Sequence, residues 1–364
     1  MLYFSIFFIS IFYTYCIESR INSKLTSGSV IFLLIFPVSL LYLIQSIQFG
    51  VGTDYFNYRM FYFEPLMLEQ FLRKKELFFY FIYNIFVDLD TGPQSIFYFA
   101  SFLYGFSLVV FLKKAKSEGL SIWILLFGFL VCTGIYHNQM NGLRNQMAIS
   151  IFPLIFFAVY KRKNITTSLL VLTSMLWHSS GVVGFVFYFF KFLHTKLESK
   201  ISLIKIFLMS LFFYVVLAFF VELLVDLLFP QYSHYIGSSY SEPISLLNIL
   251  TKLYYLPVFF YAVLLYSKRT EATISNSIVS FGMFVFAVTY WVVLLMLSYG
   301  FMFRVYQMFV FFYIFPIYYL IKYFSIKKMY VSNLLLISYL LFPYILKVIV
   351  FPKGEYIYRS YLLY

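Results

Sequence analysis

Residues 141–150 read NGLRNQMAIS and place one charged side chain, that of Arg144, between two apolar stretches. The residues before it, 120–136, and those after it, 147–160, carry no charged side chain. Further apolar stretches of about 17–22 residues recur along the chain, and a stretch of this length crosses a bilayer as a helix. The pattern predicts membrane-spanning helices, with an arginine where two of them meet.

The composition is typical of a membrane protein. The 364 residues are 63% hydrophobic and 11% charged, with a mean hydropathy of +0.88, whereas soluble domains are about 25% charged. Strands of a transmembrane barrel would show shorter, alternating segments. We therefore expect an all-α polytopic integral membrane protein. The net charge of +13 comes from short basic clusters between apolar stretches, which is the positive-inside pattern and excludes a nucleic-acid surface.

About twelve stretches are expected to cross the membrane, and two places decide the count. Residues 76–86 would form a helix of only about 17 Å, too short to span, so we expect a re-entrant or interfacial segment. Residues 165–193 form either one long span or two short helices that meet at WHSSG, 177–181. One span would place the basic residues of 191–200 and 268–269 outside, so we expect the two helices, which are tolerated where they line a cavity. The expected spans are 1–17 (retained, not a signal peptide), 29–46, 94–112, 120–136, 147–160, 165–177, 181–193, 201–220, 246–266, 274–297, 304–321 and 329–350.

The basic residues predict the orientation. Sixteen of the 27 Lys and Arg residues lie in six short loops that we assign to the cytoplasm. Both ends of the chain then face outside. No internal repeat is present, so we expect one transmembrane domain, 1–364, with external regions at 47–93 and 221–245. The six loops are 20–24, 113–116, 161–163, 191–200, 268–269 and 322–328.

Two arginines are the most unusual residues of the predicted outer face. Arg144 and Arg304 are either anchors that extend to the lipid headgroups or ligands of an anion. Both lie at outer ends of spans, where the positive-inside rule disfavours them, and Arg144 begins a helix, where its charge opposes the helix dipole. A bound diphosphate would compensate the arginine charge at both positions, because a guanidinium group is a planar, bidentate partner for a diphosphate. The amides of Asn141 and Asn145 are candidate ligand contacts beside Arg144.

A second candidate region is GTDYFNY, residues 52–58. Asp54 follows a glycine turn there, and its side chain is either a helix N-cap or a carboxylate that acts as a base or a sugar ligand. In the second interpretation Tyr55 and Tyr58 form an aromatic platform for the substrate.

His178 lies between Trp177 and two serines. It is either a satisfied polar contact inside the helix bundle or a functional residue, because histidine is rare at membrane depth. Trp177 is a candidate substrate contact beside it. Glu76 is another candidate substrate contact, although pairing with Lys74 or Lys75 is the favoured interpretation.

The sequence predicts neither a metal ion nor a cofactor. The two cysteines, Cys16 and Cys132, lie in apolar stretches and support neither a disulfide framework nor a zinc site. No glycine-rich phosphate loop, HExxH or GxSxG motif is present, and no carboxylate pair at metal spacing stands beside the arginines.

Four stretches in order resemble the Wzy-type polysaccharide polymerases, in their EpsG-like branch. The resemblance covers nearly the full length, and the stretches are VGTDYFNYRMF (51–61), NGLRNQMAISIF (141–152), KRKNITTSLLVLTSMLWHSSGVVGF (161–185) and FRVYQMFVFFYIFPIYYL (303–320). The first stretch lacks the arginine that commonly precedes the glycine–aspartate turn, a phosphate contact that Arg59 or Arg73 would replace.

The resemblance implies an enzyme of the bacterial inner membrane that joins repeat units of O-antigen, capsule or exopolysaccharide at the outer face. Donor and acceptor would both be glycans on undecaprenyl pyrophosphate, in a membrane fold like that of the C-type glycosyltransferases. It also implies inverting, metal-independent chemistry, with membrane lipids, a flippase and a chain-length regulator as partners. Within that mechanism we assign Arg144 and Arg304 to the pyrophosphate, and Asp54 and His178 to base or acceptor-positioning roles.

Two other functions remain as alternatives. A flippase or exporter of lipid-linked oligosaccharides also needs a cationic cavity, but it favours repeated halves and access from both faces. An O-antigen ligase would carry its largest external region late in the chain, whereas the longest one here is early, at 47–93.

Overall fold

The computed structural model describes residues 1–20, 27–228, 246–268 and 276–363. Within these ranges the chain is helical and contains no strand, with a single isolated antiparallel bridge between Gln48 and Ser360. Seven of the described helices are long and apolar enough to cross a membrane. The expected all-α polytopic membrane fold is therefore confirmed, while the number of about twelve spans stays a prediction. The seven are Leu2–Ser19, Ser95–Ser117, Leu143–Tyr160, Leu203–Leu223, Ser277–Ser298, Phe303–Ile326 and Tyr330–Val350.

The described residues divide into two compact units. Unit 1 comprises Met1–Tyr188 and Ser338–Tyr364, and unit 2 comprises Phe189–Ile337. A single domain over 1–364 stays a prediction. Most of the second expected external region, residues 229–245 with His234 and Glu242, lies outside the described residues.

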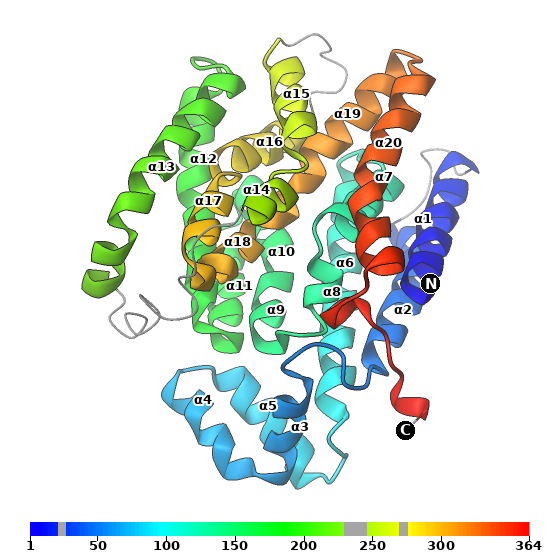
Figure 1. Cartoon of the computed structure of the whole chain (residues 1–364), viewed down its shortest axis with the longest axis vertical. Coiled ribbons are helices and arrows are strands. Elements are labelled where there is room, and N and C mark those ends of the chain that lie inside the picture. The colour runs from blue at the N-terminus through cyan, green and yellow to red at the C-terminus, as the bar shows by residue number, and fades with distance from the viewer. Residues whose placement is uncertain (21–26, 229–245, 269–275, 364) are drawn as a thin grey trace. The chain divides into compact units, whose positions relative to one another are not determined.

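Unit 1 contains a helical bundle and, at one end of it, three short helices that lie together (Figure 1). Its helices are α1 (Leu2–Arg20), α2 (Ser27–Ser46), α3 (Tyr55–Phe63), α4 (Glu69–Arg73), α5 (Leu77–Asp88), α6 (Ser95–Ser117), α7 (Ile122–Phe127), α8 (Ile135–Asn138), α9 (Leu143–Ser150), α10 (Phe152–Tyr160) and α11 (Asn164–Trp177). As expected, α5 is a short segment of 12 residues.

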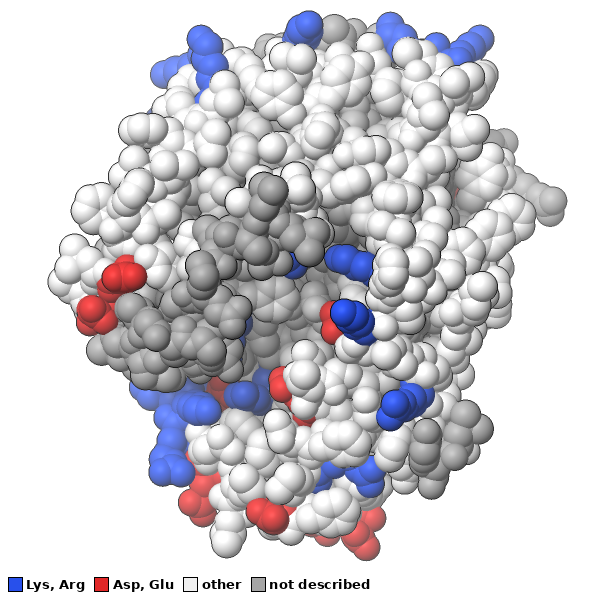
Figure 2. Space-filling model, viewed as in Figure 1, with Lys and Arg blue, Asp and Glu red and all other residues white. Residues whose placement is uncertain are grey.

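The two ends of α6 mark the two ends of unit 1. At its first end, the Gln94 amide accepts a hydrogen bond from Tyr55 of α3 at 2.9 Å. At its last turn, Lys116 pairs with Glu18 of α1 at 2.9 Å. A helix of 23 residues separates these ends by about 33 Å. Asp and Glu side chains gather over the end formed by α3, α4 and α5 (Figure 2).

The chain breaks between the expected spans 165–177 and 181–193. α11 ends at Trp177, His178 is extended (φ −157°, ψ 133°), and a 3-10 turn, Ser179–Phe185, leads into α12 (Val186–Leu197). The expected pair of short helices at WHSSG is therefore confirmed. Gly181 allows this close turn, since a Cβ there would lie 2.4 Å from a backbone carbon of Ser174.

Unit 2 surrounds a core of aromatic rings. Its helices are α13 (Leu203–Leu228), α14 (Leu246–Lys252), α15 (Leu256–Ser267), α16 (Ser277–Thr289), α17 (Val292–Ser298), α18 (Phe303–Val310) and α19 (Ile314–Ile326), and α20 (Tyr330–Ile345) continues into unit 1. The stretch 246–266, expected as one helix, is two, because Pro257 takes a first-turn position of α15, where its missing N–H leaves no bond unmade.

Three of the predicted cytoplasmic loops lie at one end of unit 2. The last turns of α12, α15 and α19 and the start of α13 come together there (Figure 1). These turns and the loops after them carry Lys196, Lys200, Lys268, Lys327 and Lys328. The three loops therefore share one side, and the assignment of that side to the cytoplasm stays a prediction.

Candidate functional site

The loop that carries Asp54 is held by the side chain of Asn141. The Asn141 Oδ1 accepts a hydrogen bond from the Asp54 backbone N–H at 3.0 Å and from the Thr53 hydroxyl at 3.2 Å. Gly52 has φ +78°, and a Cβ there would lie 2.7 Å from the same Oδ1, so the loop requires glycine. Asn141 thus positions Asp54 beside the start of α9. The Asp54 side chain makes no capping bond to α3.

Arg144, in the first turn of α9, forms an ion pair with Glu76, which precedes α5. The guanidinium carbon also lies 4.4 Å from the centroid of the Phe71 ring. Glu76 is only 2% exposed, whereas the Arg144 side chain keeps 21% of its surface exposed. A buried carboxylate therefore holds the guanidinium of a partly exposed side chain, whose Nε is buried without a hydrogen-bond partner among the described residues.

His178 contacts the other oxygen of the same carboxylate. Its Nε2 is 3.6 Å from Glu76 Oε1, and its Nδ1 accepts the Ser180 backbone N–H at 3.2 Å. Because Nδ1 accepts that bond, a neutral His178 carries its hydrogen on Nε2, facing Glu76. The Ser180 hydroxyl lies 2.6 Å from the same Nδ1 and 3.2 Å from Asn145 Oδ1. The helix break after α11 is thereby fixed to the first turn of α9.

Tyr58 completes the group. Burial raises the pKa of the Tyr58 hydroxyl, and the charge of Arg144 opposes that rise while the charge of Asp54 adds to it. These opposed effects on the pKa place Tyr58 within electrostatic reach of both charged groups. We call Asp54, Tyr58, Glu76, Arg144 and His178 the Arg144 cluster, and all five belong to unit 1.

The remaining candidates of unit 1 lie around the cluster. Tyr55 is buried and donates to Gln94 at 2.9 Å. The Arg59 guanidinium carbon lies over the rings of Phe49, at 5.6 Å, and Tyr55, at 5.9 Å. Trp177 is buried, with its ring centroid 5.5 Å from that of Phe78. Their contact with a substrate stays a prediction.

Arg304 belongs to unit 2, where it lies exposed at the start of α18. Its joint action with Arg144 on one anion stays a prediction.

The ion pair between Arg144 and Glu76 was not predicted from the sequence. The sequence favoured Lys74 or Lys75 as partner of Glu76, but the structure pairs Glu76 with Arg144, 68 positions away. No local signal marks such a pair. In the described part of the chain, no three His, Cys, Asp or Glu side chains are grouped so as to hold a metal ion.

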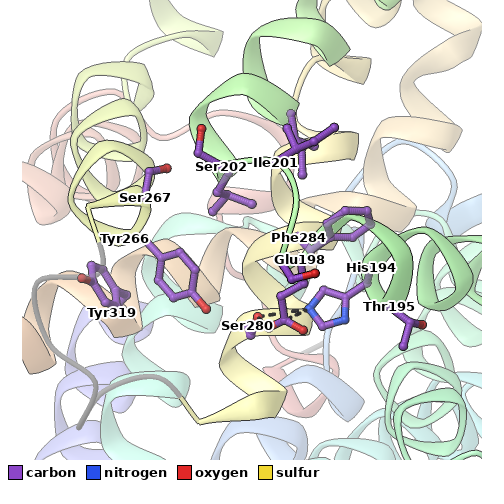
Figure 3. A pocket seen from close by; sticks show the side chains of 13 residues that line it. His194, Thr195, Glu198, Ile201, Ser202, Tyr266, Ser267, Ser280, Phe284 and Tyr319 are labelled. Atoms are coloured by element: carbon purple, nitrogen blue, oxygen red, sulfur yellow. Dashed lines mark hydrogen bonds and ion pairs between the residues drawn. The ribbon is translucent and has the colours of Figure 1, made fainter.

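A second polar cluster lines a cavity of about 580 Å³ at the basic end of unit 2 (Figure 3). Ser280 donates to Glu198 at 2.5 Å, and the His194 Nε2 is 3.1 Å from the Ser280 hydroxyl and 3.6 Å from the Glu198 carboxylate. A hydrolytic triad needs the serine on one ring nitrogen and the acid on the other. Here both meet Nε2, so this cluster is not arranged for nucleophilic catalysis.

A model of the EpsG family matches residues 30–364, nearly the whole chain. No curated protein and no solved structure matches.

Proposed function

The chain belongs to the EpsG family, and on that premise we propose that it polymerises polysaccharide repeat units at the outer face of the bacterial inner membrane. Membership of the family indicates a polymerase of this general type, and the reaction below is the proposal. The observation that supports it is the Arg144 cluster. In this cluster the partly exposed Arg144 side chain pairs with Glu76 at the start of an apolar helix, and Arg144 and the Asp54 carboxylate both act electrostatically on Tyr58.

In the proposed reaction a sugar hydroxyl of the acceptor attacks the anomeric carbon of the donor glycan. A new glycosidic C–O bond forms, and the C–O bond from that carbon to undecaprenyl pyrophosphate breaks. The hydroxyl proton passes to a base, and the pyrophosphate leaves with the bonding electron pair. Negative charge therefore develops on the diphosphate, where preorganised cationic donors lower the barrier.

Arg144 is the proposed partner of that diphosphate. The Glu76 carboxylate engages its Nη1; the Nε–H has no partner among the described residues, and the side chain is 21% exposed, so the proposal is that its remaining N–H donors meet the anion. Because the pair with Glu76 orients the fork before substrate binds, less conformational entropy is lost on binding. His178 faces the carboxylate that holds Arg144, so we assign it a positioning role. Arg304 is the proposed second cation.

Asp54 is the proposed general base. Its side chain is partly exposed and does not cap α3, and its one hydrogen-bond donor among the described residues is the Thr53 hydroxyl, 3.3 Å from Oδ1, which is shared with Asn141. A carboxylate in this state can accept a proton from a sugar hydroxyl. Arg59 and the amide of Asn145 are the proposed direct contacts of the glycan, and the buried Tyr55 and Trp177 are proposed to support them from behind.

The test uses the purified full chain in lipid, supplied with undecaprenyl-pyrophosphate-linked repeat units. Elongated glycans should form, also after exhaustive chelation, because the proposed reaction uses guanidinium groups where other enzymes use a metal. Asp54→Asn should lower the rate by about 10²- to 10⁴-fold, whereas Asn57→Ala on the exposed side of α3 should not. Transfer only to a lipid A core sugar, or transport without bond formation, would contradict the proposal.

A further inference from the structure

An open groove runs along unit 1 between α2 and α6, with a volume of about 690 Å³. It follows α2 from Ile31 to Ser46, which is about 22 Å along a helix. One leaflet of a bilayer core is about 15 Å thick. The groove is therefore long enough to take a complete acyl chain lying along the helices.

The walls of the groove are apolar and shaped by a close helix contact. Phe102 and Phe106 are exposed and stacked, with centroids 6.3 Å apart. Gly105 lies between them in sequence and approaches the ring of Tyr42 so closely that a Cβ would be 3.2 Å away. Because Gly105 has no side chain, α2 and α6 can approach closely at the bottom of the groove, and Phe102 and Phe106 flank this contact.

One end of the groove carries charge. Lys113 and Lys114 line it in the last turns of α6. Neighbouring lysines in this basic region are paired, Lys116 with Glu18 at 2.9 Å and Lys161 with Glu118 at 2.6 Å. Among the described residues, Lys113 and Lys114 have no carboxylate partner. The two lysines that reach the groove are thus available to an anion.

We propose that this groove binds one anionic phospholipid, with its phosphate on Lys113 and Lys114 and one acyl chain along α2 and α6. Basic residues at the end of an apolar groove match the charge and shape of such a lipid, and each lysine near a membrane surface strengthens anionic-lipid binding about fivefold. The charged end of the groove lies at the end of α6 opposite to that of Tyr55 and Gln94, and the proposed lipid site does not depend on the proposed reaction.

Native mass spectrometry of the purified full chain, with titration of phosphatidylglycerol against phosphatidylcholine, tests the proposal. We expect one phosphatidylglycerol bound in preference, and an affinity about 25-fold lower in the double variant Lys113→Gln/Lys114→Gln. The matched control Lys196→Gln/Lys200→Gln removes the same charge from exposed positions of unit 2 and should bind as the parent does.

A second variant tests the groove without touching the lysines. Ser39 is exposed and lines the groove, so Ser39→Trp fills it without repacking the core and should reduce binding at least fivefold. The proposal is overturned if phosphatidylcholine binds equally, if the retained mass is a polyprenyl phosphate, if both lysine double variants lose affinity equally, or if Ser39→Trp binds as the parent does.

Discussion

Replacing Arg144 by lysine separates two roles of this residue. Its ion pair with the buried Glu76 stabilises the fold, and its exposed donors are the proposed contacts of a diphosphate. Lysine keeps the positive charge and can still neutralise Glu76, but it has no planar, bidentate fork. Alanine would instead leave the buried Glu76 carboxylate without its cation, which lowers the stability of the fold by about 3–5 kcal/mol. An activity assay on that variant would then report the loss of folded protein.

The expected effect of Arg144→Lys on the rate follows from the loss of the fork. Removing one preorganised donor from developing oxyanion charge costs about 2.7–4 kcal/mol, which is roughly 100- to 1000-fold in rate. Because the charge beside Glu76 remains, the amount of inserted protein should equal that of the parent. Chain length on a glycan gel should fall toward one repeat unit while the lipid-linked substrate accumulates.

The control is Arg162→Lys, an exposed arginine in the loop after α10. It should leave the ladder of glycan lengths unchanged at equal protein level. If Arg144→Lys also gives a normal ladder, the guanidinium fork does not act on the diphosphate and Arg144 is a structural partner of Glu76 only.

Three further predictions concern packing, pH and orientation. Gly181→Ala should lower stability by about 1–3 kcal/mol, because the added Cβ would lie 2.4 Å from backbone. The loss should appear as a lower thermal midpoint in detergent. Gly142 has open space around it, so Gly142→Ala should leave the midpoint unchanged. Burial lowers the pKa of His137 to about 3, so unfolding takes up a proton below pH 6.5. The stability due to this group is complete above pH 6.5 and should fall by about 1.4 kcal/mol per pH unit toward pH 3. His137→Phe should flatten this slope, and an unchanged slope in the variant would assign it to other groups. In a cysteine-free background, Asn57→Cys should react with an impermeant thiol reagent in spheroplasts and Ser117→Cys should not, and the reverse result would invert the orientation.

The fold could be predicted from the sequence wherever the deciding forces are local. The break at WHSSG was predicted because a single span over 165–193 would place the basic cluster 191–200 outside, and the structure ends α11 at Trp177. The division of 246–266 was missed, because the mean hydropathy of the stretch is high, although Lys252 lies where α14 ends and Pro257 lies where α15 begins. Hydropathy reports the environment of a segment and not the continuity of its hydrogen bonds.

The candidate site was predictable as a set of residues but not as a set of contacts. Charged residues that are rare in an apolar chain are visible at once, and Asp54, Arg144 and His178 were selected in this way. The partner of Glu76 depends on how α5 and α9 pack, and Asn141 was expected to meet substrate although it holds the Asp54 loop. Such contacts join distant segments, so no spacing along the chain reveals them.

The discontinuous make-up of unit 1 has a consequence for biogenesis. His137 packs against Tyr3 from the first helix and against Tyr356, with ring centroids 4.7 and 4.3 Å away. The ribosome completes all of unit 2 between residues 188 and 338, which takes roughly 8–30 s at about 5–20 residues per second. During that interval the first helices are already in the bilayer, and the place of Tyr356 beside His137 is unfilled. A chain arrested in unit 2 would therefore leave the His137 imidazole without its last aromatic neighbour.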